Sequence, residues 1–239
     1  MTESKFFPAV VIGFALVISA LIFGLFYYSG QSVSSKDILS VTGSAKTRVT
    51  SDQVKLTIAL VRPSTQQSLG TGYNAIAKDL ALTKDFLKKE GVDSNMITEG
   101  TVAMNQMYKP NGDNNEYELR QVLTIQSADV AKITDISKRV SSLASQGAII
   151  SVQSLEYYYS KLPDLRVSLL SDAIKDAKAR AEKIAQGTGR EVGNVQAASS
   201  GVVQVLPPSS VDVSDYGAYD TSSIDKDVMI TVKASFRLK

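Results

Sequence analysis

The sequence predicts an α+β fold, with one or more mainly antiparallel sheets, three helices packed on one face, and one transmembrane helix before them. Three observations carry this prediction. An uncharged apolar run opens the chain, strand-like segments with alternating apolar residues recur after it, and three segments have apolar residues at helical spacing. After the membrane helix we expect the order β-β-α-β-β-α-β-α-β-β. The 239 residues then divide into a tail and membrane helix over residues 1–28, a linker over 29–37 and one soluble domain over 38–239.

The apolar run is the first element. No residue between Phe6 and Ser35 is charged, and the part from Phe6 to Tyr28 is strongly apolar. As a helix it would span roughly 34 Å, enough to cross a hydrocarbon core of ~30 Å. The alternative is a cleavable signal peptide, whose apolar region is typically about 7–15 residues long and ends at a small-x-small site. Residues 30–32 match such a site poorly, so we expect a retained helix.

Two strands and a long helix are expected next. Residues 38–45 and 53–62 are rich in strand-forming residues, and the second segment alternates until Pro63 interrupts it. The helix is expected over residues 65–90, because apolar side chains recur there at helical steps. Gly91 follows at the position of a C′ glycine, so the helix should end there.

A hairpin and a second helix are expected in the middle of the chain. Residues 96–108 and 116–127 read as its strands, with a turn at Asn111-Gly112. The helix should run over residues 128–145 and end at Gly147.

The remaining elements are a strand, a third helix and two final strands. The strand is expected over residues 148–159, the helix over 163–186, and the last two strands over 191–200 and 228–238. One face of the helix should be apolar, formed by Leu170, Ala173, Ile174, Ala177, Ala181 and Ile184. The polar, acidic stretch over residues 207–227 is expected to be a loop.

The composition excludes several chemistries. The chain has no Cys and no His, so it has no thiolate nucleophile or thiolate metal site, and it lacks the commonest general acid/base and transition-metal ligand. A Ser-His-Asp triad is likewise excluded, whereas the composition leaves a Ser-Lys dyad open, although no motif indicates one. The formal net charge of +2 gives no strong attraction to nucleic acid. We therefore expect no catalytic residues, no cofactor and no metal site, and we expect that the protein is not an enzyme.

The acidic loop is the candidate contact surface. It holds carboxylates, which suit hard cations, but their spacing lacks the order of a calcium-binding EF-hand loop. It also holds tyrosines, which are enriched at protein interfaces. The predicted contact residues are Asp212, Asp215, Tyr216, Tyr219 and Asp220. A solvated surface loop without a partner is the competing interpretation.

Three stretches of the chain, taken in order, resemble the SIMPL-domain family. They are SVTGSAKTRVTSDQVKLTIAL from Ser40 to Leu60, FLKKEGVDSNMIT from Phe86 to Thr98, and LLSDAIKDAKARAEKIAQGTGREVGNV from Leu169 to Val195. The resemblance implies an exported protein of the bacterial periplasm or outer membrane. Some family members are surface immunogens and some resemble ring-forming, channel-like oligomers. The family has no defined catalytic residues to carry over.

Two functions remain in view. The first is a single-pass inner-membrane protein whose soluble domain lies in the periplasm or extracytoplasmic space and assembles as a homo-oligomer, with a structural or interaction role in the envelope. Its five-residue tail before the helix is typical of a signal anchor, although basic residues on the two sides do not decide the orientation. The alternative is a periplasmic small-molecule or lipid binder linked to envelope stress.

Overall fold

The computed structural model describes residues 6–30, 37–108, 115–210 and 212–239, and the side chains of helix residues 6–10 and 26–30 are not described. Over these residues the chain has four α-helices and ten strands. The helices are α1 (Phe6–Gly30), α2 (Leu69–Lys89), α3 (Val130–Arg139) and α4 (Leu162–Gly187). The strands are β1 (Ile38–Thr50), β2 (Gln53–Thr65), β3 (Ile97–Glu99), β4 (Ala103–Gln106), β5 (Glu116–Ser127), β6 (Ile150–Tyr158), β7 (Val192–Ser200), β8 (Gln204–Leu206), β9 (Ala218–Tyr219) and β10 (Asp225–Leu238).

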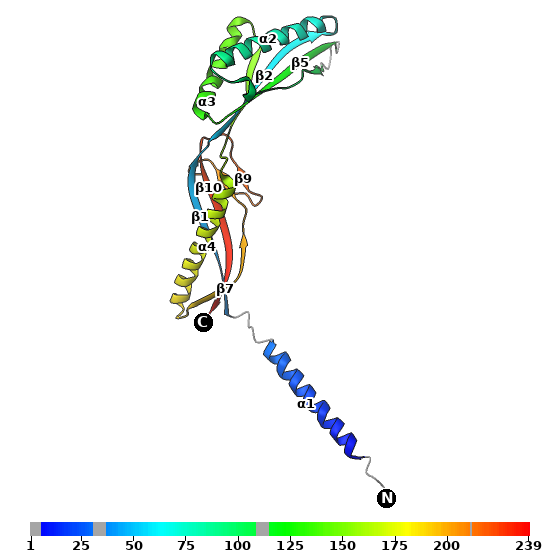
Figure 1. The fold of residues 1–239 in the computed structure, drawn as a ribbon, viewed down its shortest axis with the longest axis vertical. Helices are drawn as coiled ribbons and strands as arrows, with labels where there is room; N and C mark the ends of the chain where they lie inside the picture. Colours follow the sequence, from blue (N-terminus) through cyan, green and yellow to red (C-terminus); the bar gives the residue numbers. More distant parts are fainter. Residues whose placement is uncertain (1–5, 31–36, 109–114, 211) are drawn as a thin grey trace.

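The strands form two five-stranded sheets, which define two lobes stacked end to end (Figure 1). In the first lobe the sheet order is β1-β10-β8-β9, with β7 also paired to β10, and α4 packs on the sheet. In the second lobe the order is β3-β5-β2-β6, with β4 also paired to β5, and α2 and α3 cover one face. All pairings are antiparallel except β8 with β9.

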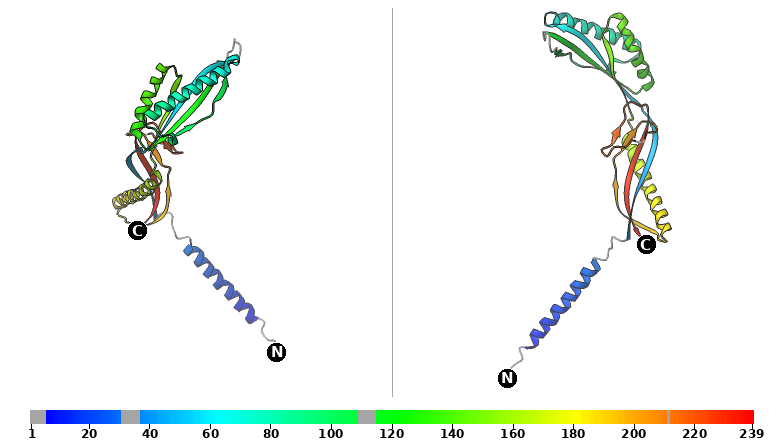
Figure 2. Two further views of the ribbon diagram at one scale, coloured as in Figure 1. Left: turned by 45° about the horizontal axis from the view of Figure 1, so that its top comes forward. Right: turned by 180° about the vertical axis from the view of Figure 1, so that it is seen from behind.

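The α+β class with antiparallel sheets is confirmed, but the placement of three helices on one face is wrong. The reason lies in β1 and β2, which are separated by only two residues yet do not pair. Ser51-Asp52 lacks the Asn-Gly or Asp-Gly chemistry of a two-residue hairpin, so the chain continues extended from one sheet into the other. Figure 2 shows this passage between the lobes in two further views.

Several boundaries also differ from the prediction. The second helix of the domain is divided, because α3 ends at Arg139 and a 3₁₀ helix continues as Val140–Gln146. The strand expected over residues 96–108 is interrupted between β3 and β4, where the Gly100 N–H donates to the Val122 carbonyl. The stretch expected to be a loop contains β9. The helix count also differs, because the described part of the domain has 3₁₀ helices besides α2, α3 and α4, including Gln66–Ser68 and Ser94–Met96. The predicted turn at Asn111-Gly112 lies outside the described residues.

The second lobe has the larger core. Leu56, Ile58 and Leu60 of β2 lie in the core with α2 and α3 and are fully buried, as predicted, but Thr57 and Ala59 between them are buried as well. Gly91 has φ +71°, the left-handed conformation expected at the C′ position. The Arg62 guanidinium of β2 binds Asp79 of α2 through two bonds of 2.7 Å and also donates to the Gly147 carbonyl at 2.6 Å. This buried ion pair joins α2 to the sheet.

The helix α1 extends over 25 residues without a charged side chain in its first or last turn. Its described side chains, residues 11–25, are exposed. Within the described residues, no helix combines the length and the hydropathy of a membrane span. The side chains at both ends of the predicted span, and residues 31–36 of the predicted linker, lie outside what is described.

Candidate functional site

The five residues predicted as contacts occupy two different environments. Asp212, Asp215 and Tyr216 lie on the exposed loop between β8 and β9, here called the contact loop, and the Tyr216 side chain is 96% exposed. Tyr219 lies on β9 and Asp220 directly follows it, where the chain turns back between the two lobes. The Tyr219 hydroxyl accepts a hydrogen bond from the Tyr159 N–H at 3.0 Å. The structure therefore brings only the first three together on a free surface.

Asp220 belongs to a compact polar cluster with Lys226. Its carboxylate accepts hydrogen bonds from the backbone N–H and the hydroxyl of both Ser222 and Ser223. The Lys226 side chain is fully buried, and its ammonium donates to the carbonyls of Asp220 at 2.5 Å and Ser223 at 2.6 Å. The nearest opposite charge is the Asp220 carboxylate, 3.4 Å away.

The pKa values of Asp220 and Lys226 are both lowered, but for different reasons. Partial burial alone would raise the pKa of Asp220, but the hydrogen bonds from Ser222 and Ser223 outweigh it and hold the pKa well below its usual range. Burial lowers the pKa of Lys226, although the Asp220 charge opposes the shift. Ion pairs with shifted pKa values also occur in purely structural networks, so these shifts alone do not indicate an active site.

The loop over residues 220–224, here called the junction loop, connects the lobes. The Tyr157 N–H of β6 donates to the Thr221 carbonyl at 2.8 Å, and the Ser51 N–H between β1 and β2 donates to the Ile224 carbonyl at 2.9 Å. Beside it, the Asp52 carboxylate accepts from the Ser160 hydroxyl at 2.7 Å. The two segments that cross between the lobes, at residues 51–52 and 159–161, are therefore hydrogen-bonded to each other or lie beside the junction loop. Lys226 stabilises the conformation of that loop through its bonds to two of the loop carbonyls.

Asp227 forms a second buried charge cluster, on the first lobe. Its carboxylate lies 2.7 Å from the Lys46 ammonium and 2.9 Å from Arg48 Nε, both on the adjacent strand β1. It also accepts from the Ser209 N–H at 3.1 Å. The bond from Arg48, followed by that from Lys46, lowers the pKa of Asp227. Because two basic side chains and a backbone N–H hold this carboxylate in its charged form, we assign it a role in packing β1 against β10.

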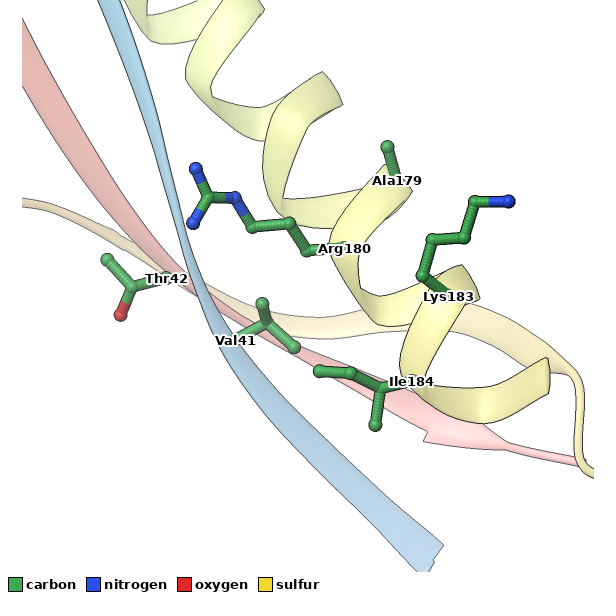
Figure 3. A pocket seen from close by; sticks show the side chains of 6 residues that line it. All are labelled: Val41, Thr42, Ala179, Arg180, Lys183 and Ile184. Atoms are coloured by element: carbon green, nitrogen blue, oxygen red, sulfur yellow. The ribbon is translucent and has the colours of Figure 1, made fainter. Parts of the chain in front are cut away.

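A mainly apolar hollow of the domain lies between β1 and α4 (Figure 3). It has a volume of about 550 Å³ and is lined by Val41, Thr42, Ala179, Arg180, Lys183 and Ile184. The Val41 and Ile184 side chains approach each other across the gap, while Lys183 extends outward from the helix. The apolar floor thus has Lys183 and Arg180 at its rim, the latter ion-paired with Asp176, and no carboxylate in its lining.

A close approach of α4 to β1 creates this hollow. A Cβ on Gly43 would lie 2.2 Å from the Ala173 carbonyl oxygen and 2.4 Å from the Ala177 nitrogen, so only glycine fits. The buried row of α4 is Leu169, Ala173, Ala177, Ala181 and Ala185. Because these small residues face the sheet, Ile174 and Ile184, expected on the buried face, remain 39% and 49% exposed.

Among the described residues, no group of three or more His, Cys, Asp or Glu is placed to hold a metal ion. Another hollow, of about 410 Å³, lies beside the contact loop and is lined by aliphatic residues, two tyrosines and Arg166. Neither hollow places a nucleophile beside a base.

Two features of this region escaped the sequence-based reasoning. The buried Lys226 had no local signal, because it stands in an acidic stretch that resembles a solvated loop. The hollow did have one: a glycine two residues after Val41 and alanines four residues apart in the helix permit close helix–sheet packing. This spacing does not say which strand meets which helix.

Comparison with known proteins gives one extensive match. The model of the SIMPL family, described as a protein of unknown function (DUF541), matches residues 39–236. The comparison with curated proteins found no match. Among solved structures, the chain is similar to a protein of methicillin-resistant Staphylococcus aureus described as a "putative aminohydrolase", at 12% identity and a TM-score of 0.22. That similarity covers 52% of this chain and 32% of the other, and at this score it carries no argument.

Proposed function

Because this chain belongs to the SIMPL (DUF541) family, whose description assigns no function, we propose a function from its own residues: a membrane-anchored, extracytoplasmic interaction module that assembles with copies of itself in the bacterial envelope. The proposal has three parts, which are the anchor, the side of the membrane and the self-association. Each is supported by a different feature and has its own test.

The anchor is supported by the sequence of the N-terminal segment. From Phe6 to Tyr28 the residues are apolar and uncharged, and α1 is helical over 25 residues, or ~37 Å. A helix satisfies its own backbone hydrogen bonds, as a membrane span requires. The test is the intact mass of the protein extracted from native membranes. A mature N-terminus after residue 28 would refute a retained anchor.

The extracytoplasmic side is supported by the family resemblance. A single cysteine can report it, because the chain has none of its own. Val213 is 64% exposed on the contact loop, so Val213→Cys offers a reachable thiol. It should react with a membrane-impermeant thiol reagent in intact spheroplasts. Reaction only after lysis would place the domain in the cytoplasm.

The exposure of Tyr216 is the single observation that carries self-association. A tyrosine that is 96% exposed supplies a large contact area at low entropic cost. Asp212 and Asp215 flank it and are also exposed. Anchors in one membrane would raise the effective concentration of the domains, so that weak contacts could suffice. Closed cyclic symmetry is the usual result, which favours a ring with its anchors on one side.

The test uses the full chain in mild detergent and measures particle mass by light scattering. Only the exposed residues should be changed, because Tyr219 and Asp220 hold the lobes together. The combined variant Asp212→Ser, Asp215→Ser, Tyr216→Ser should lower the mass to that of a monomer. The control is Tyr108→Ser, which removes another exposed tyrosine, 78% exposed, from the second lobe. A parent that is monomeric at micromolar concentration would refute assembly, and a variant that assembles like the parent would refute the loop as its contact.

The alternative, a binder of a small molecule or lipid, is favoured by one observation. The hollow between β1 and α4 is within the range of volumes typical of ligand pockets and has a mainly apolar lining. It is complete within one copy of the chain, so it does not depend on assembly. Detergent-free extraction followed by mass spectrometry of bound molecules would test this alternative.

A further inference from the structure

We infer that the hollow between β1 and α4 binds the anionic headgroup region of a phospholipid at the membrane surface, and thereby holds the first lobe against the bilayer. The inference rests on the proposed anchor, and it adds a second, reversible contact with the same membrane. It follows from three properties of the hollow, namely its charge, its apolar floor and its distance along the chain from α1.

The charge of the hollow favours an anion. Lys183 forms no ion pair among the described residues, and its ammonium is free to bind a phosphate. Arg180 is ion-paired with Asp176 through its Nε at 2.8 Å and donates from Nη2 to the Ser44 hydroxyl at 3.4 Å, so only its remaining N–H groups can bind another acceptor. No carboxylate lines the hollow. Basic pockets beside a membrane bind anionic headgroups through this kind of contact.

The apolar floor favours an amphiphile over a free anion. Ile184 is 49% exposed and faces Val41 across the hollow, and Ala179 and Thr42 complete the lining (Figure 3). A glycerol backbone and the first acyl carbons could cover Ile184 while the phosphate reaches Lys183. A free phosphate would leave the same apolar side chains in water. A phospholipid satisfies both parts of the hollow.

The chain length between α1 and the hollow keeps it near the membrane. Asp37, the first described residue after the linker, follows the last residue of α1 by seven positions. Seven residues span at most ~25 Å even when fully extended. Val41 follows Asp37 by only four residues and lies near the start of β1. A weak site held this close to the headgroups would be occupied because of its high effective concentration.

The experiment uses the full chain in lipid nanodiscs and two fluorescent probes. Gln186→Cys places a probe on α4 beside the hollow, and Asn74→Cys places a matched probe on α2 in the second lobe; both side chains are exposed on helices. Lipids with a nitroxide on the headgroup quench a probe that lies at the surface. In nanodiscs with phosphatidylglycerol the residue 186 probe should be quenched, and the residue 74 probe should not. In pure phosphatidylcholine the quenching at 186 should fall.

A charge variant tests the role of the rim. Lys183→Glu should reduce the docked-to-undocked ratio at least fivefold, since one cation near an anionic surface contributes about 1 kcal/mol. Lys78→Glu, an exposed lysine on α2, should leave the ratio unchanged. Equal quenching of both probes in an incorporated chain, or an unchanged ratio for Lys183→Glu, would overturn the inference while the anchor stands. Loss of quenching on adding inorganic phosphate at constant ionic strength would overturn the lipid as ligand in favour of a free anion. A chain that does not incorporate into nanodiscs would refute the anchor and this inference with it.

Discussion

Replacing the buried Lys226 by methionine should destabilise the protein by about 3 kcal/mol. The ammonium is fully buried and donates to two carbonyl oxygens, those of Asp220 and Ser223, at 2.5 and 2.6 Å. A hydrogen bond from a charged donor contributes about 1.5–3 kcal/mol, so the two together contribute roughly 3–6 kcal/mol. Methionine keeps the length of the side chain and avoids the cost of burying a charge, which offsets part of the loss.

The assay is urea unfolding of the full chain in mild detergent, followed by circular dichroism of the tyrosines, since the chain has no Trp. Lys233→Met, on the exposed side of the same strand, is the control and should change the free energy of unfolding by less than ~0.5 kcal/mol. Hydrogen exchange should also accelerate at the Ser51 and Tyr157 amides, which donate to the junction loop. A loss below ~1 kcal/mol, or unchanged exchange at these amides, would show that Lys226 does not hold the lobes together.

Three further predictions concern packing, a buried ion pair and acid sensitivity. Gly43→Val should cost at least ~3 kcal/mol of unfolding free energy because its Cβ meets the α4 backbone, whereas Gly187→Ala, with nothing within 4 Å, should be neutral or stabilising; equal effects would contradict the packing argument. Arg62→Met should cost about 3–5 kcal/mol by leaving Asp79 buried without a partner, and adding Asp79→Leu should recover most of it; an additive loss in the double variant would argue against this reasoning. The pKa of Asp220 is lowered in the folded state. The carboxylate therefore contributes to the free energy of unfolding above its unfolded-state pKa of about 3.9, and this contribution is lost as the pH falls further. Asp220→Asn should therefore make stability fall less steeply below about pH 4, and an unchanged slope in acid denaturation would refute this assignment.

The junction loop changes how the contact loop should be studied. Residues 207–227 were expected to form one polar loop, and a deletion through Thr221 would be a natural test of that prediction. The structure shows that the Thr221 carbonyl binds Tyr157 and that Asp220 belongs to the Lys226 cluster. Such a deletion would loosen both lobes and confuse a folding defect with a lost interface. Substitutions confined to the exposed tip avoid this.

The helices and strands of the domain were predictable to the extent that their signals are local. Alternation in β2 located the buried Leu56, Ile58 and Leu60, and Gly91 marked the end of α2 by its left-handed conformation. The short strands β8 and β9 were missed because two or three residues are too few to show a period. The alanine row of α4 was partly misplaced, since alanine and isoleucine both count as apolar while only alanine allows the close approach to Gly43.

The sequence by itself determined the α+β class, most element positions, the family resemblance and the absence of thiol and imidazole chemistry. Only the tertiary structure decided that β1 pairs with β10, placing Val41 opposite Ala234, while β2 joins a separate sheet. It alone showed that Lys226 is buried and that α4 and β1 enclose a hollow with a cationic rim. The physical reason is that a local pattern reports only that one face of an element will be buried. Which surface covers that face depends on contacts between residues distant in the chain, and such contacts leave no periodic signal in the sequence.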